Sequence, residues 1–352
     1  MKKKMFKSNM LLLYVPLLFL LCIPLSAQNA RKEISETYNV KKGFTFNVES
    51  KYSDIELLTW DRDVLDVLVI VDVDAGSKEK SENIIRNINI DIKETGNSVS
   101  YITNLDFPGN LGKGVKLDIK YTVKLPSYLN VTIENSYGNV YIQELAGLAK
   151  LDLQYGNLKI NKLARGNVKP YNNIEIAYGN AGIEEAGWLE LGISYSEFEA
   201  SKFDMLFVES KYSKLYGENA GTVISEGKYD KYTFRELDNF VAELKYSNVK
   251  IDKLHQKFDL NASYTNVKID YLLKGFEKIS ADLSYGNFSA VTETGISYNL
   301  NADSKYGEIN VSPASDLSRS RQNGNVKVWG TVGTNPKSDI NIVTRYGNIS
   351  IK

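Results

Sequence analysis

Cysteine and histidine are almost absent from this chain. Its 352 residues include one cysteine, Cys22, and one histidine, His255. Cys22 lies in the apolar N-terminal segment, so removal of that segment leaves no disulfide partner. His255 has no cysteine or second histidine to share a metal and no recognisable catalytic serine beside it. We therefore predict no catalytic residue, no metal site and no cofactor, and we interpret His255 as a surface residue in a return loop.

The chain also lacks net charge and, beyond its first residues, long apolar runs. Its 43 basic residues balance 43 acidic ones, so no overall field indicates nucleic acid. Lys2, Lys3 and Lys4 precede an apolar stretch from Met10 to Leu25, which is typical of a secretory signal peptide. We expect a mature chain without a transmembrane segment, in the periplasm, at the outer membrane surface or outside the cell. Acylation at Cys22 is an alternative, although Leu21 occupies a place where lipoprotein signals have a small residue.

One short sequence motif recurs along nearly the whole chain: a tyrosine, usually followed by Gly or Ser, then Asn and alternating apolar residues. Between Tyr178 and Tyr246 the interval is 17 residues four times in succession. The motif occurs at Tyr52, Tyr137, Tyr155, Tyr178, Tyr195, Tyr212, Tyr229, Tyr246, Tyr264, Tyr285, Tyr306 and Tyr346, and Asn323-Gly324 occupies one further repeat position. A fixed period this short indicates stacked units, each too small to bury its own apolar face.

The residues around each tyrosine alternate with period 2 and predict strands. Phe240, Ala242, Leu244 and Tyr246 share one face, but Val249 returns to that face only if a corner intervenes. Gly or Ser with Asn supplies the corner, because Gly reaches positive φ freely and Asn tolerates it. About 17 residues cannot hold a helical crossover, so we predict an all-β, parallel β-solenoid (β-helix) of 17–23-residue coils. Roughly thirteen coils would make a rod about 60 Å long.

The repeated tyrosines and asparagines have two interpretations. Stacked aromatic rings are found on carbohydrate-binding faces, but the same-face register with Leu244 places these rings at the inner edge of the corner, where they stack along the axis. The asparagines two places later can form a coil-to-coil amide ladder. We interpret both sets as a structural corner ladder of Tyr155, Tyr178, Tyr195, Tyr212, Tyr229, Tyr246, Tyr264, Tyr285, Asn157, Asn180, Asn248, Asn266 and Asn287.

The chain divides into a signal peptide at residues 1–27, an N-terminal β-rich cap at 28–130 and a solenoid repeat domain at 131–352. The first coil, around Tyr52, is followed by an 85-residue gap to the next tyrosine, which indicates an insertion with one short helix at Ser77–Ile88. Gly109, Gly112 and Gly114 in that insertion fit no phosphate-binding spacing. The chain ends on a coil, from Tyr346 to Lys352, without a cap. A bare coil invites end-to-end strand addition, so its removal is expected to abolish assembly and leave the rod folded.

Charged residues follow the repeat in two columns. Acidic residues stand three places before many of the tyrosines and basic residues one place before. A solvated face of exposed i, i+2 ion pairs explains the pattern simply, since each such pair contributes only about 0–1 kcal/mol. The alternatives are a docking strip for a charged polysaccharide or a Ca²⁺ site, for which one column offers too few oxygens. The possible charged binding strip comprises Glu209, Lys211, Glu226, Lys228, Glu243 and Lys245.

Several motifs together carry a resemblance to a known family. They are the signal peptide, the Tyr52-Ser-Asp-Ile-Glu-Leu coil with Trp60 after it, the strand from Lys120 to Pro126, and the Tyr-Gly-Asn-Val coils. With these the chain resembles the putative-adhesin β-solenoid family of bacterial envelope proteins and, more loosely, the head domain of putative autotransporter adhesins. The resemblance implies a fold, brings no catalytic residues, and implies a Gram-negative envelope protein that binds a glycan or an envelope or surface protein.

Three functions therefore remain open. The first is a non-enzymatic secreted envelope or cell-surface protein that binds a partner or has a structural role. The second is a carbohydrate-active β-helix enzyme, a polysaccharide lyase or hydrolase, which would need a carboxylate cluster off the regular columns. The third is a periplasmic scaffold that docks a partner through its C-terminal coil.

Overall fold

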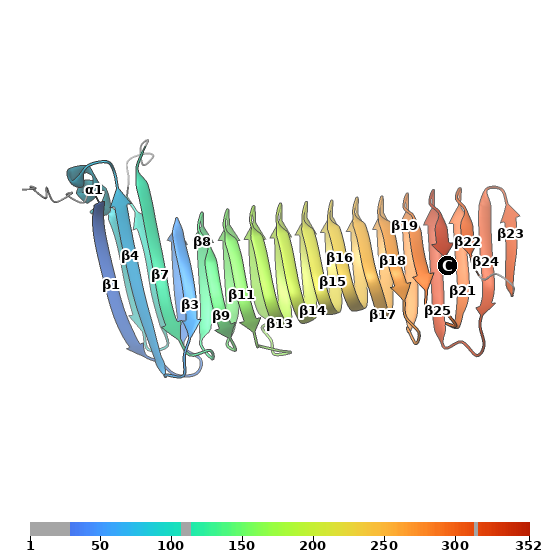
Figure 1. Cartoon of the computed structure of the whole chain (residues 1–352), viewed down its shortest axis with the longest axis horizontal. Helices are drawn as coiled ribbons and strands as arrows, with labels where there is room; N and C mark the ends of the chain where they lie inside the picture. Colours follow the sequence, from blue (N-terminus) through green and yellow to red (C-terminus); the bar gives the residue numbers. More distant parts are fainter. Residues whose placement is uncertain (1–28, 107–113, 313–315) are drawn as a thin grey trace, which may run out of the picture.

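The computed structural model describes residues 29–106, 114–312 and 316–352, which form 26 strands and one helix. The chain is all-β, and its strands join one mixed sheet in which most pairings are parallel. Figure 1 shows the strands side by side along the long axis of the molecule. The predicted signal peptide, Cys22, Gly109 and Gly112 lie outside the described residues.

Each repeat forms one coil: a strand in a first layer, a tyrosine corner, and a strand in a second layer. The first layer begins with β2 (Thr45–Lys51), β8 (Asn130–Ser136), β10 (Ala149–Gln154) and β12 (Asn172–Ala177). The second layer begins with β3 (Ser53–Thr59), β9 (Val140–Leu145) and β11 (Asn157–Leu163). Within each layer the strands of successive coils pair in parallel, as Phe46 with Val131 and Val131 with Ala149.

In the 17-residue region a single strand crosses from the second layer of one coil to the first layer of the next. These strands are β13 (Asn180–Ser194), β14 (Glu197–Lys211), β15 (Lys214–Lys228), β16 (Lys231–Lys245) and β17 (Asn248–Ser263), followed by β18 (Asn266–Leu272), β19 (Lys278–Ser284) and β20 (Phe288–Thr292). Residues at the same place in successive coils stack in register, so Leu206, Val223 and Phe240 are consecutive partners and all are buried. The alternating apolar residues of both layers thus form one continuous core, in which each large side chain contributes about 1.5–3 kcal/mol.

The residue that turns the corner is the tyrosine itself. All twelve repeat tyrosines have φ between 51° and 64°, whereas Gly286 and the other glycines directly after a tyrosine do not have positive φ. The prediction that Gly supplies the left-handed residue was therefore wrong. A left-handed residue breaks the alternation of side chains, so the tyrosine points outward and 39% to 55% of it is exposed. The predicted position of the rings at the inner edge of the corner was wrong for the same reason.

Where glycine follows the tyrosine, it is needed because of close approach between coils. A Cβ built on Gly286 would lie 1.9 Å from the carbonyl oxygen of Thr265 in the preceding coil. Gly138, Gly156 and Gly179 meet the carbonyl of the preceding coil in the same way, at 1.9–2.0 Å. The glycine thus lets two corners stack at strand spacing.

We predict that Gly286→Ala lowers the free energy of unfolding by about 1–3 kcal/mol, because the new methyl group forces the backbone of adjacent coils apart. The matched control is Gly96→Ala, since a Cβ on Gly96 meets nothing within 4 Å and its φ is not positive. The control should change stability by no more than about 0.5 kcal/mol. Equal denaturant midpoints for the two variants would contradict this account of the corner.

The N-terminal end combines the first coil with an antiparallel insertion. β2 and β3 pair directly with β8 and β9, although 85 residues separate their tyrosines. The inserted segment forms β4 (Val64–Asp74), α1 (Lys78–Ile85), β5 (Ile88–Thr95), β6 (Ser98–Leu105) and β7 (Lys116–Leu125). β6 and β7 extend the two layers, β5 pairs antiparallel with β6, and β4 joins β7 to β1 (Asn29–Asn39). The single helix, capped by Ser77, lies against β1 and β4.

The C-terminal coil does not lie at the end of the stack. The last segments are β21 (Tyr298–Lys305), β22 (Ile309–Val311), β23 (Leu317–Gln322), β24 (Asn325–Val332), β25 (Ser338–Arg345) and β26 (Ile349–Ile351). β25 pairs with both β19 and β21, and β26 with both β20 and β22. The final coil is thus inserted between two earlier ones, as the position of the C-terminus in Figure 1 shows. The expected bare terminal coil, with its end-to-end contact, was wrong.

An antiparallel hairpin covers one edge at this end of the stack. β24 pairs with β21 and with β23, and Asn323 and Gly324 connect β23 to β24. Both turn residues have positive φ, as a two-residue type I′ turn requires. Asn323-Gly324 therefore forms a hairpin turn beside Tyr306 and not a thirteenth coil corner. Arg319 in β23 also donates to the carbonyl of Ile309, which protects the short edge strand β22.

Removal of Tyr346–Lys352 should destabilise the stack, because it deletes β26 from between β20 and β22 and leaves two strand edges unpaired. We expect a lower melting temperature and faster amide hydrogen exchange in β20 and β22. Ser350→Ala, which keeps the backbone of β26, is the control. A truncated chain with unchanged melting temperature and exchange would contradict the inserted position of this coil.

Candidate functional site

A groove runs along the outer surface of the first layer, beside the tyrosine corners. It has a volume of about 920 Å³ and extends over strands β10 to β19. Its walls come from the residues three places and one place before each tyrosine, which point away from the core. At some of these places the residue is small, as at Ala177, Gly192 and Ser194, and the wall is lower there. The regular register of the coils thus creates a long, shallow channel parallel to the molecular axis.

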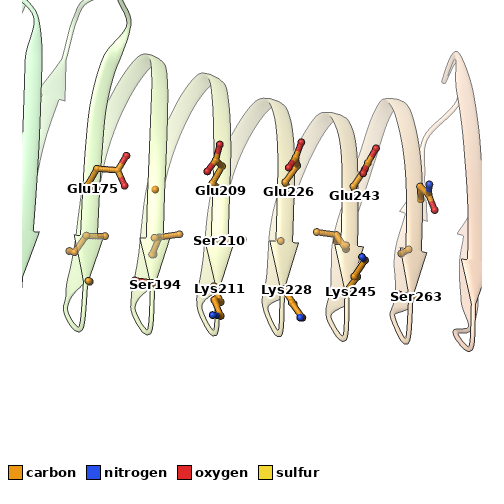
Figure 2. Close-up of a pocket in the computed structure, with 18 of the residues that line it drawn as sticks. Glu175, Ser194, Glu209, Ser210, Lys211, Glu226, Lys228, Glu243, Lys245 and Ser263 are labelled. Carbon is orange, nitrogen blue, oxygen red and sulfur yellow. The ribbon is translucent and has the colours of Figure 1, made fainter.

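The six predicted strip residues lie in this groove as two separate rows. Glu209, Glu226 and Glu243, here called the acidic strip, are consecutive partners in the parallel ladder. Lys211, Lys228 and Lys245, here called the basic strip, are partners in the same way, nearer the corner. Figure 2 shows the acidic row and the basic row on opposite sides of the groove.

The expected ion pairs within each strand do not form. Among the residues that the structure describes, no hydrogen bond or salt bridge joins a member of the acidic strip to a member of the basic strip. The Nζ atoms of Lys211 and Lys228 instead lie 5.5 and 5.2 Å from the ring centroids of Tyr212 and Tyr229. These two lysines thus lean toward their own tyrosines, within the distance of cation–π contacts. The glutamates are left facing the groove without a cationic partner.

Gly192 opens a gap in the acidic column, and Glu175 fills it. A Cβ on Gly192 would lie 1.8 Å from Oε2 of Glu175, so the carboxylate lies directly over the glycine. Burial raises the pKa of Glu175; a hydrogen bond from Asn173 opposes the rise, and the charges of Asp152, Glu209 and Glu190 add to it. The wall of the groove therefore carries an uncompensated negative potential.

An apolar row accompanies the two charged strips. Phe207, Ile224 and Val241, here called the apolar strip, are partners in successive coils two residues before the acidic strip. They are half-buried or exposed, and Ile224 is 39% exposed. Tyr171 stacks on Phe207 with ring centroids 5.6 Å apart, and Trp188 packs beside both. From the outer side to the corner, the face thus carries apolar, acidic, basic and aromatic rows.

The tyrosines form one uninterrupted stack along the corner. Neighbouring ring centroids are 4.6–5.2 Å apart from Tyr52 to Tyr285, and Tyr346 then lies between Tyr285 and Tyr306. The stack contains all eight of the predicted ladder tyrosines. Each interior ring has both faces covered by its neighbours, so a sugar ring has no flat aromatic surface to stack on. The edges and hydroxyl groups alone meet solvent.

The asparagines form two ladders with a gap between them. Asn157 donates to Oδ1 of Asn139 at 2.9 Å and accepts from Asn180 at 3.0 Å. Asn287 likewise donates to Asn266 at 3.0 Å and accepts from the backbone of Asn348 at 2.9 Å. Glu197, Lys214 and Lys231 occupy the intervening places, and the backbone of Asn248 donates to the carbonyl of Asp230. In the middle coils the N–H groups at these places therefore donate to backbone carbonyls of the preceding coil.

A second, buried ladder satisfies a different donor, the N–H of the residue directly after the tyrosine, and sequence reasoning missed it. In it each corner N–H donates to the side-chain oxygen of the residue that follows the tyrosine in the next coil. The donors Gly179, Ser196, Ser213, Asp230 and Ser247 bond in turn to Ser196, Ser213, Asp230, Ser247 and Thr265 at 2.8–3.4 Å. The available signal was the change from Gly to Ser, Asp or Thr after the tyrosine, which marks where this ladder replaces the asparagine one.

Asp230 is the one carboxylate in the buried ladder. Its oxygens accept from the N–H of Ser213 at 2.8 Å and the hydroxyl of Ser210 at 2.9 Å. A side chain on Gly227 would collide with Tyr232 and Asp230, so the glycine makes room for the group. Burial raises the pKa of Asp230, and the hydrogen bonds from Ser213 and Ser210 only partly oppose this.

The raised pKa of Asp230 predicts a pH-dependent stability. Because its folded pKa exceeds the unfolded value of about 3.9, the stability it contributes is present in acid and is lost as the pH rises through the folded pKa. Asp230→Asn should therefore gain stability relative to the wild type between about pH 4 and pH 7. Urea midpoints across this range provide the measurement, with exposed Asp204→Asn as control. A stability difference between the wild type and Asp230→Asn that stays constant with pH would contradict the prediction.

Other groups with catalytic potential are engaged elsewhere. His255 lies in β17, half-buried, and its Nε2 is 2.9 Å from Oε2 of Glu236. The hydrogen bond from Lys253 and then that from His255 lower the pKa of Glu236. The described residues contain no group of three or more His, Cys, Asp or Glu side chains arranged to hold a metal ion. They also contain no helix of the length and apolarity that a membrane span needs.

Comparisons with known proteins return solved structures only. No family model matches the chain, and no curated protein does. The chain is similar to a putative adhesin from Parabacteroides merdae, with 12% identity, a TM-score of 0.33, and coverage of 93% of this chain and 97% of that one. It is also similar to a putative adhesin from Bacteroides fragilis, with 10% identity, a TM-score of 0.27, and coverage of 91% of this chain and 97% of that one. A putative lipid binding protein from Parabacteroides distasonis has 11% identity, a TM-score of 0.30, and coverage of 93% of this chain and 98% of that one. Two of the three names are adhesin names, like that of the family which the sequence resembles. At such identities and TM-scores, we draw the function from the chain's own residues.

Proposed function

We propose that the chain is an exported, non-enzymatic β-solenoid of the cell envelope that binds a partner through the face bearing the acidic and basic strips. A glycan and an envelope or surface protein are the two classes of partner that such a face suits. The carrying observation is that the glutamates and lysines of the groove stand in separate rows without pairing to each other.

Unpaired rows of charge favour a binding role over a purely structural one. If these residues served only to keep the face solvated, each glutamate could form an ion pair with the lysine of its own strand and the face would still be solvated. Burial raises the pKa of Glu175, and the charges of Asp152, Glu209 and Glu190 add to the rise through like-charge repulsion. A partner with complementary charge would relieve it.

The carbohydrate-active enzyme is the less favoured alternative. Glycoside hydrolysis uses two carboxyl groups that flank the scissile bond, about 5–10 Å apart. In this groove the carboxylates of the acidic strip lie along one wall, and lysines lie along the other. The acidic groups that line the groove follow the repeat, and Glu190, five places before Tyr195, is a neighbouring acidic residue outside that column. This arrangement suits recognition along the length of the rod.

We further propose the domain division that the sequence suggests, with a cap at residues 28–130 and a repeat domain at 131–352. The antiparallel strands β1, β4 and β5 and the helix α1 support it, since they lie at one end of the parallel stack (Figure 1). Export through a signal peptide at residues 1–27 completes the proposal.

Protease accessibility on intact cells tests the localisation. The structure favours the exposed turn at Asn97 for the epitope tag, because Lys352 bonds to Ala290 and Thr292 within the stack. Digestion of the tag on intact cells, with a periplasmic marker preserved, would support a surface role. Digestion only after the outer membrane is opened would support a periplasmic envelope role. Retention of the tagged chain in the cytoplasmic fraction would overturn the proposed function.

A further inference from the structure

We propose that the partner of the strip face is a second copy of this chain, bound side by side with its axis parallel to the first. This rests on the proposed function, because it names the partner of the same face. The observation behind it is the order of the four rows across that face: apolar, acidic, basic and aromatic. That order is complementary to itself under one particular two-fold rotation.

The geometry follows from the positions of the rows. A two-fold axis that runs along the groove, between the acidic and basic strips, exchanges the two sides of the facing copy. The partner's lysines then oppose Glu209, Glu226 and Glu243, and its glutamates oppose Lys211, Lys228 and Lys245. The partner's apolar strip meets the edges of Tyr212, Tyr229 and Tyr246. Because both copies share one coil spacing, the rows match along the axis, and the contact is isologous.

The opposite orientation is excluded by charge. A two-fold axis perpendicular to the rod would place glutamates against glutamates and lysines against lysines, which is destabilising in closely opposed rows. The face therefore accepts a parallel copy and rejects an antiparallel one. Both N-terminal ends of the pair consequently lie at the same end of the assembly.

The separation of acidic from basic positions holds along the entire stack, beyond the three coils that carry the strips. At all twelve corners the residue three places before the tyrosine is acidic or uncharged, and the residue one place before it is basic or uncharged. No coil therefore presents a like-charged pair to its counterpart in the parallel arrangement. Glu49 and Lys51 repeat the complete pattern in the first coil, and Asp303 and Lys305 repeat it in a coil at the far end.

The area available suits a specific but weak dimer. Twelve coils span about 55–60 Å, and the distance from the apolar row to the corner is about 17 Å. A face of this size offers on the order of 900 Å² per partner, close to the roughly 800 Å² of a standard interface. Much of it is charged and wet, so we expect a dissociation constant in the micromolar range that rises with salt.

Complementary charge reversal is the test. Variant A carries Glu209→Lys, Glu226→Lys and Glu243→Lys, and variant B carries Lys211→Glu, Lys228→Glu and Lys245→Glu. Each variant alone presents two rows of one sign and should dimerise at least 100-fold more weakly than the wild type. An equimolar mixture of A and B restores opposite charges in both rows and should form a heterodimer. Sedimentation velocity measures all three states, and circular dichroism checks the fold of each variant.

The control reverses three exposed acidic residues away from the groove, Glu184→Lys, Glu199→Lys and Asp204→Lys, and should dimerise as the wild type does. A wild type that stays monomeric up to about 1 mM would overturn the proposal. Wild-type dimers that persist in A and B alone, or a mixture that forms no heterodimer, would also overturn it.

The two proposals fail in different ways. Binding of monomeric wild type to a sulfated polysaccharide, lost in variant B, would keep the proposed function and assign the face to a glycan. Cytoplasmic retention of the tagged chain would sink the proposed function, whatever sedimentation shows of the purified protein.

Discussion

The left-handed backbone of the corner tyrosine is the constraint on which the rest of the structure depends. For a non-glycine residue this conformation costs roughly 1–2 kcal/mol. Twelve tyrosines adopt it, so the surroundings must supply a compensating gain at each coil. Stacking with the ring of the next coil supplies part of it, since such aromatic pairs contribute about 0.5–1.5 kcal/mol beyond the area they bury. A single tyrosine would find no such partner, and the corner is therefore a property of the stack.

The stacking in turn fixes how the corner's polar groups are satisfied. At strand spacing the N–H groups of one corner reach the next coil and not their own. Where an asparagine stands two places after the tyrosine, its backbone or side-chain N–H donates to the asparagine oxygen of a neighbouring coil; the acceptors are Asn139, Asn157, Asn266 and Asn287. In the middle coils, buried Ser, Asp and Thr oxygens accept from a different group, the N–H of the residue directly after the tyrosine. The two solutions explain why the residue after the tyrosine changes between Gly and a hydroxyl or carboxyl side chain along the chain.

The sequence predicted the all-β class and the parallel pairing because the 17-residue period and the alternating pattern leave no other way to bury the apolar residues. It also predicted that the first coil joins the second across an insertion with one helix. It misjudged the left-handed residue, because Gly and Asn are the usual residues at positive φ and stacking between coils is invisible in one repeat. The inserted final coil was equally hidden. Tyr346 follows Tyr306 by 40 residues, and this spacing does not say whether the last coil stacks beyond the coil of Tyr306 or between that coil and the coil of Tyr285.

For the candidate site, the sequence predicted where the charged residues lie but not which of them pair. The period placed glutamates and lysines in columns, but distance along a strand did not decide whether neighbours two places apart would pair. In the structure Lys211 and Lys228 lean toward the outward-pointing tyrosine rings at the strand ends and not toward the glutamates. The glutamates then have no cationic partner on their own strand. The tyrosine corner that stabilises the fold thus also keeps the acidic and basic rows of the groove apart. A surface whose charges are not paired with each other can bind a partner of complementary charge, whereas a surface of ion pairs cannot.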